Sequence, residues 1–274
     1  MEIRKRFKVY WPFSISVIQT LLSYRVNFFI FVAGGILQTF VIYYLWRAVF
    51  YSSGQETLEG FTIGTMLIYI FMSEITSRIV QSDVDRAIGD EVKQGTIAMN
   101  LIRPISYHIR LLFMAIGGNL YQFIFICLPI WVGVESYRYF SLGGGLPDLR
   151  VFFFYFLSIS LSFIILFLFN LCFGLMAFFV TNMWGFSRLK GVIIAFFSGQ
   201  IIPLVFFPEA LQRILNFFPF ASMNYIPVMI YLNKIEGNEM FRALGVQFFW
   251  VIILGIISTL IWNKAISRLT ILGG

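Results

Sequence analysis

Residues 151–187 read VFFFYFLSISLSFIILFLFNLCFGLMAFFVTNMWGFS, a stretch without Asp, Glu, Lys or Arg. A helix needs about 20 predominantly apolar residues to cross the ~30 Å hydrocarbon core of a bilayer, so this stretch predicts a membrane-spanning helix. The composition of the whole chain agrees, because 59% of its 274 residues are hydrophobic and only 12% are charged. With a mean hydropathy of +0.85, an ordinary water-soluble domain is excluded.

Similar stretches continue on both sides and predict one all-α membrane domain over residues 1–274. We expect six transmembrane helices, at 26–50, 61–80, 109–135, 150–182, 188–207 and 242–263. The second of these carries Glu74 and Arg78, whose i,i+4 spacing lets them pair near one membrane face. We interpret this pair as mainly structural, because a lone charge within a membrane is costly.

Residues 208–233 are also largely apolar, but prolines and Asn224 interrupt them. Such a segment fits a re-entrant helical hairpin on the outer side better than a straight span. Four prolines shape this hairpin and the span before it: Pro203, Pro208, Pro219 and Pro227.

The charges predict the orientation of the chain. There are 20 Lys and Arg against 13 Asp and Glu, which gives a net charge of +7. Six spans place most of the cations on the side of both termini, and the positive-inside rule makes that side cytoplasmic. We interpret residues 1–25 as an amphipathic helix on the inner membrane surface, in contact with lipids. A disordered basic tail is the alternative.

The most polar segment, 82–107, lies on the cytoplasmic side between the second and third predicted spans. We expect one short helix that ends near Gly95, a second that begins after Thr96, and a break at Pro104. An amphipathic insertion of this size predicts a docking surface. A merely solvated loop is the alternative.

The residue inventory argues against an enzyme. His108 is the single histidine, and Cys127 and Cys172 both lie in apolar runs, so no histidine triad, metal site or disulfide framework is indicated. No Gly-Lys dipeptide occurs, and the phosphate-binding GxxxxGK[ST] motif is therefore absent. We expect no cofactor in this chain, and any ATP must be bound by another chain.

Three stretches together resemble the permease subunits of ABC-2 type ATP-binding-cassette exporters, and among them the bacterial drug and viologen exporter-like subgroup. They are YRVNFFIFVAGGILQTFVIYYLWRAVF (24–50), EVKQGTIAMNLIRPISYH (91–108) and IPLVFFPEALQRILNFFPFASMNYIPVMIY (202–231). The acidic residue, glycine and proline of the family's inner loop correspond to Glu91, Gly95 and Pro104. The family's outer prolines correspond to Pro203, Pro208 and Pro219.

The resemblance implies a coupling helix in the 82–107 region, which docks on separate ATPase subunits that bind ATP and Mg. The residues that we assign to this coupling are Asp90, Glu91, Gly95, Arg103 and Pro104. It also implies a second, non-identical permease subunit, with a homodimer as the alternative. Gly34 and Gly35 allow close backbone approach, so we expect them among the contacts. We expect a bacterial cell membrane as the location, and no nucleic-acid partner.

Two other functions compete with an exporter permease. A secondary transporter would work without ATP, but the predicted membrane interior offers only Glu74 and Arg78, close to the inner face, whereas ion-coupled transporters place ionisable groups near the midplane. An intramembrane enzyme would need a paired acidic motif facing the histidine, which no predicted span contains.

The cargo is indicated only by class. Aromatic, methionine and small polar residues favour an amphipathic or hydrophobic substrate such as a drug, peptide or lipid-like molecule. Candidate pathway residues are Met66, Tyr69, Met72, Asn170, Met176 and Thr181. The alternative is that such residues face lipid and neighbouring helices, as most of the 34 phenylalanines do.

Overall fold

The computed structural model describes residues 2–141, 143, 147–180 and 183–272, and these residues form helices joined by turns and loops, without a strand. Five helical stretches are long and apolar enough to cross a membrane: Phe28–Ser53, Ile63–Lys93, Tyr107–Phe140, Leu149–Phe178 and Gly237–Ser267. The prediction of an all-α membrane protein is therefore confirmed.

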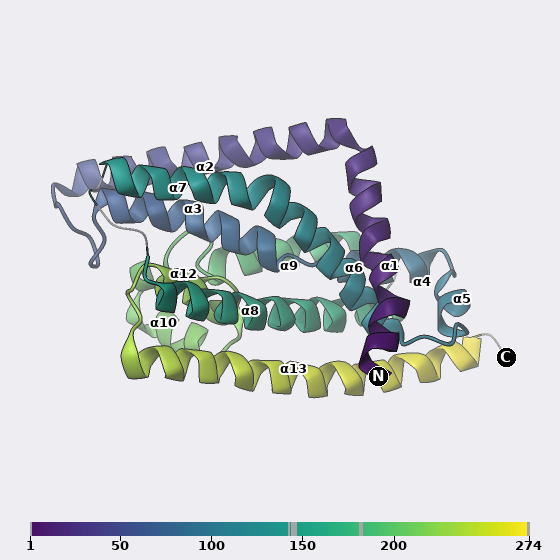
Figure 1. Ribbon diagram of the computed structural model, residues 1–274. Helices are drawn as coiled ribbons and strands as arrows, with labels where there is room; N and C mark the ends of the chain where they lie inside the picture. Colours follow the sequence, from purple (N-terminus) through teal and green to yellow (C-terminus); the bar gives the residue numbers. More distant parts are fainter. Residues whose placement is uncertain (1, 142, 144–146, 181–182, 273–274) are drawn as a thin grey trace.

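The long helices run lengthwise along the bundle (Figure 1). They are α2 (Arg25–Ser53), α3 (Ile63–Val80), α6 (Tyr107–Gln122) with α7 (Leu128–Ser141), α8 (Leu149–Leu175) and α13 (Gly237–Leu272). Helix α8 is central and packs against α3, α4, α12 and α13. Most of α2, in contrast, is exposed, with 6% of its apolar window buried.

A π-helical turn, η1 (Phe123–Cys127), joins α6 to α7. Pro129 lies two residues after the end of this turn and has no N–H, so it cannot donate the normal helical hydrogen bond to the preceding turn. A π turn is one way for a helix to absorb such a defect. The third predicted span is thus continuous but locally widened.

The fifth predicted span differs from expectation. Helix α9 covers Met183–Phe197 instead of 188–207, and at 1.5 Å per residue it is only about 22 Å long. Gly199 has a left-handed φ of 82°, and the carbonyl of Ser198 accepts a hydrogen bond from Tyr225 N at 2.9 Å. Both features end the helix well before Pro203. The sixth crossing thus stays a prediction, because α9 is shorter than a full bilayer core.

The predicted hairpin at 208–233 consists of short helices: α10 (Glu209–Asn216), α11 (Phe220–Met223) and α12 (Tyr225–Tyr231), preceded by the short turn η3 (Leu204–Phe206). Pro203, Pro208 and Pro219 each stand directly before one of these elements, and Pro227 lies in the first turn of α12. In each place the missing N–H costs little. The prolines therefore set where each short helix begins.

Helix α1 (Glu2–Ser23) crosses the long helices near one end of the bundle, where α13 also ends (Figure 1). It packs closely on α6: Ser14 Oγ donates to Phe113 O at 2.5 Å, and a Cβ on Gly117 would overlap the Ser14 backbone. A helix at this angle to the spans fits the predicted interface helix at 1–25.

Candidate functional site

The predicted coupling region contains two short helices, α4 (Val84–Lys93) and α5 (Ile97–Leu101). Helix α4 contacts the turn η2 (Met176–Phe178). Helix α5 projects beyond α4 at the end of the bundle where α13 ends (Figure 1). Helix α4 packs directly against the backbone of α8. A Cβ on Gly174 would come within 2.8 Å of Ile88 Cδ1 and 2.9 Å of Asp85 Cα, so only glycine permits this contact. Ile88 is fully buried there.

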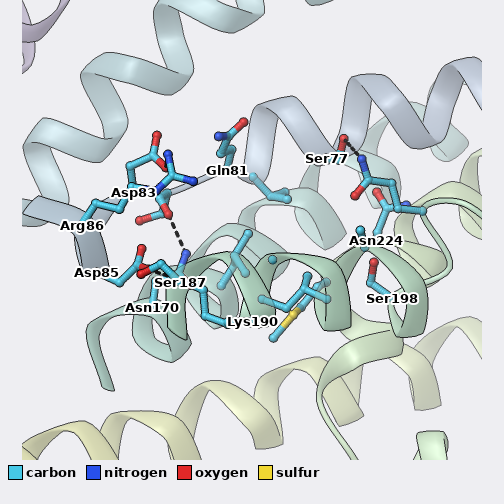
Figure 2. A pocket seen from close by; sticks show the side chains of 18 residues that line it. Ser77, Gln81, Asp83, Asp85, Arg86, Asn170, Ser187, Lys190, Ser198 and Asn224 are labelled. Carbon is cyan, nitrogen blue, oxygen red and sulfur yellow. Dashed lines mark hydrogen bonds and ion pairs between the residues drawn. The ribbon is translucent and has the colours of Figure 1, made fainter. Parts of the chain in front are cut away.

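A buried ion pair ties α4 to α9. Lys190 Nζ lies 2.7 Å from Asp85 Oδ2, and Ser187 Oγ donates to the same oxygen at 2.7 Å (Figure 2). The side chains of Asp85 and Lys190 are 3% and 7% exposed. A buried charge pair persists only when its partners stay in place, so this contact fixes α4 relative to α9.

Asn170 on α8 extends this ion pair into a network. Its Oδ1 accepts a hydrogen bond from Lys190 Nζ at 2.5 Å, and its Nδ2 donates to Ser82 O at 2.6 Å. Sequence reasoning placed Asn170 among the pathway residues. Its side chain lines the adjoining cavity and also joins α8, α9 and the segment before α4 in one hydrogen-bonded group.

A cavity of about 250 Å³ lies beside this network, between the C-terminal end of α3 and helices α8 and α9. Figure 2 shows Asp85 and Lys190 toward one end of it and Ser198 and Asn224 at the other. Asn224 Nδ2 donates to Ser73 Oγ at 2.6 Å, while its Oδ1 is buried without a partner. The volume is below the range of ligand pockets but sufficient for several waters. This cavity is therefore smaller than the usual site for a drug-sized cargo.

A second ion pair ties α4 to α6. Glu91 Oε1 lies 2.7 Å from Arg110 Nη2, and Glu91 Oε2 accepts from Tyr107 Oη at 2.8 Å. We expected Glu91 to contact an ATPase, but its carboxylate is engaged within the chain. The buried Arg110 guanidinium requires a counter-charge, and Glu91 is the acid that α4 presents to it.

The other predicted coupling residues are exposed. Asp90, Gly95, Arg103 and Pro104 face away from the bundle, and Gly95 has a left-handed φ of 71° that ends α4 as expected. Beyond them, Met99 and Ile102 are large apolar side chains on the exposed surface, and Ile102 is 83% exposed. Asp90 and Lys93 on α4 are exposed as well, so the segment from α4 to residue 104 presents both apolar and charged side chains to the surroundings.

Three of the predicted pathway residues are core residues. Met66, Tyr69 and Met72 are almost fully buried in the core around α3, and Tyr69 Oη donates to Gly199 O. Their side chains face α3's neighbours because α3 is packed on several sides. Met176 is exposed at the end of α8. Thr181 lies outside the described residues.

The predicted pair on α3 is present in the structure. Arg78 Nε and Nη2 each lie 2.6 Å from Glu74 Oε1, and the two side chains are 16% and 14% exposed. A Cβ on Gly35 would overlap Arg78 Nη2. Gly35, expected at a contact with a second subunit, therefore makes room for Arg78 of its own chain, whereas Gly34 has open space around it.

The sequence analysis assigns no role to Asp85 or Lys190. Asp85 lies in the polar segment 82–107, and Lys190 lies at the start of the span predicted at 188–207. The available signal was the position of Lys190 at the start of an apolar helical run, one turn from Ser187. A lysine there must either reach the membrane surface or find an acid.

Comparison with known proteins identifies the family that this arrangement fits. Residues 36–273 match the family model described as ABC-2 family transporter protein. No curated protein matches the chain.

Proposed function

The chain belongs to the ABC-2 family of transporter proteins, and from that premise we propose that it is the permease subunit of an ATP-driven exporter. Members of this family are multi-pass membrane subunits that pair with ABC ATPase subunits. In the proposal, this chain forms half of the pathway for an amphipathic or hydrophobic cargo. A separate ATPase subunit binds ATP and Mg and supplies the driving force, so the chain itself carries out no catalysis.

The observation that carries the proposal is the way α4 is attached to the bundle. Its inner face contacts α8 at Gly174, α9 through Asp85–Lys190 and α6 through Glu91–Arg110. Because three helices hold it by buried contacts, displacement of α4 must displace them as well. This supports α4 as the element that transmits movement of an ATPase to the spans.

The surface available to the ATPase is the tip formed by Met99 and Ile102 with the charges Asp90, Lys93 and Arg103. An apolar centre with a charged rim is the usual composition of a specific protein interface. In this proposal the role of Glu91 differs from that of Asp90. Glu91 holds α4 on the bundle, whereas Asp90 is free to meet the partner.

A second permease subunit completes the pathway in this proposal. Helix α2 supports it, because its large apolar side chains Ile36, Leu37 and Val41 are exposed to the surroundings. A non-identical partner is proposed, with a homodimer as the alternative. The positive-inside distribution supports cytoplasmic termini in a bacterial cell membrane.

A secondary transporter is the alternative function, and one observation favours it. The buried Asp85–Lys190 pair lines the polar cavity beside α3, α8 and α9, in addition to the Glu74–Arg78 pair on α3. Buried ionisable pairs occur in the proton relays of transporters. The two functions differ in their energy source, which makes them separable by experiment.

The test purifies a tagged chain from its own host membranes and measures ATP hydrolysis in the preparation. Ile102→Glu should lower the co-purified ATPase activity at least several-fold, because a charge at the centre of an interface opposes docking. Phe140→Glu is the matched control, since Phe140 is 82% exposed on α7, away from α4 and α5. Activity that is equal in both variants, or absent from the wild type while a proton gradient drives transport, contradicts the proposal.

A further inference from the structure

A narrow groove of about 490 Å³ lies between α2, α3 and the η1–α7 turn. Its walls are almost entirely apolar and include Phe40, Leu67, Phe71 and Ile130. The polar groups among its lining residues are Thr39, Tyr43 and the pair Glu74–Arg78. Its volume lies within the range of small-molecule pockets.

The groove follows the length of α3 on one helical face. Leu67, Phe71, Glu74 and Arg78 line it, at spacings of three or four residues, which place side chains one above the other. At 1.5 Å per residue, these four residues cover about 16 Å along the helix axis. That is about half of the ~30 Å hydrocarbon core, or the depth of one leaflet.

The charged end of the groove lies toward the cytoplasmic side in the proposed orientation. Arg78 stands two residues before the end of α3 at Val80, whereas Leu67 lies nearer its start. Arg78 Nε and Nη2 both contact Glu74 Oε1. A guanidinium has five N–H donors. Further donors therefore remain for an oxygen atom near the inner membrane surface.

The π turn contributes to the same groove. Phe125 and Ile126 lie in η1, and Pro129 follows it, and all three are among the lining residues. π turns are frequent at functional sites because they displace side chains from the regular helical positions. Gly35 and Thr39 on α2 line the same groove.

We propose that this groove binds one acyl chain of an inner-leaflet phospholipid, with an ester or phosphate oxygen of the lipid accepting a hydrogen bond from Arg78. Apolar walls one leaflet deep suit an acyl chain, and a charge pair at the inner end suits the polar part of the same molecule. The exposure of α2 gives access from the bilayer. The proposal depends on the membrane location and orientation of the chain and not on the energy source for transport.

The test reconstitutes the full chain in vesicles of phosphatidylethanolamine and phosphatidylglycerol that contain a phospholipid with a photoreactive group in one acyl chain. After irradiation, the labelled peptides are identified by mass spectrometry. Labels should concentrate on residues 28–43 and 123–130. Thr39→Phe, which fills the groove, should reduce that labelling by about tenfold.

Two controls separate occupancy from folding. Thr39→Val keeps the groove open and should label as the wild type does, and so should Leu45→Phe, because Leu45 is exposed on α2 and does not line the groove. The neutral double variant Glu74→Gln/Arg78→Gln should still label, but without the preference of the wild type for a phospholipid probe over a diacylglycerol probe that lacks a headgroup.

Uniform labelling of α2 and of the exposed face of α13 would overturn the proposal, as would unchanged labelling in a folded Thr39→Phe variant. A disulfide between two copies through Phe40→Cys, with no lipid label, would also overturn it, and would identify the groove as an interface between copies of the chain.

Discussion

Lys190 Nζ on α9 lies 2.7 Å from Asp85 Oδ2 on α4, and both side chains are buried. This contact connects α4, the helix that precedes the projecting α5, to α9 within the bundle. Ile88 packs against Gly174 and Glu91 pairs with Arg110, so three contacts together fix α4 to the membrane domain. The predictions below test that attachment.

Asp85→Asn should destabilise the protein by about 3 to 5 kcal/mol, because it leaves Lys190 charged and buried without its counter-ion. The double variant Asp85→Asn/Lys190→Met should recover most of that loss. Thermal unfolding in detergent measures both effects. If the single variant unfolds at the wild-type temperature, the pair does not hold α4 in place.

Gly174→Ala should displace α4, because the added Cβ would stand 2.9 Å from the backbone at Asp85 Cα, which cannot rotate away. We expect normal membrane insertion but loss of ATP-driven transport and weaker association with the ATPase. Gly133→Ala is the control, since its Cβ would meet no atom within 4 Å. Equal transport by the two variants would show that the close contact is not required.

Glu91→Ala should lower stability by about 3 kcal/mol, because Arg110 loses its buried partner. Asp90→Asn, a change at the neighbouring exposed carboxylate, should leave stability within about 0.5 kcal/mol of the wild type. Chemical or thermal denaturation distinguishes the two. The reverse order, with Asp90 essential for stability, would contradict the assignment of roles on α4.

The topology can be tested with single cysteines and an impermeant thiol reagent in sealed cells. Cysteines at Ser53, Asn238 and Glu209 should react from outside, and those at Gln94 and Trp184 should not. The native Cys127 and Cys172 are buried and give little background. Trp184 lies at the start of α9, and Glu209 lies beyond its end. If cysteines at both positions react from outside, α9 does not cross the membrane.

Most spans were predictable because uncharged runs of the required length are visible without any tertiary information. The Glu74–Arg78 contact was predictable for a similar reason, since both residues lie on one helix at a spacing of four. The left-handed Gly95 also follows from local chemistry.

The contacts of α4 could not be predicted from the sequence. Asp85 pairs with Lys190 and Glu91 with Arg110 across separate helices, and no local pattern indicates which acid meets which base. The early end of α9 at Phe197 likewise depends on Tyr225, whose N–H bonds the Ser198 carbonyl after the chain has turned back. These features arise from tertiary packing.

The central claim, that the tip of α5 meets an ATPase subunit, is tested most directly by a photoreactive amino acid at position 102. In membranes from the native host, it should form a covalent product with an ABC ATPase subunit, and the yield should change when ATP is added. The same amino acid at position 140 should form no such product. If position 102 gives no product while the ATPase still co-purifies with the chain, the coupling surface lies elsewhere.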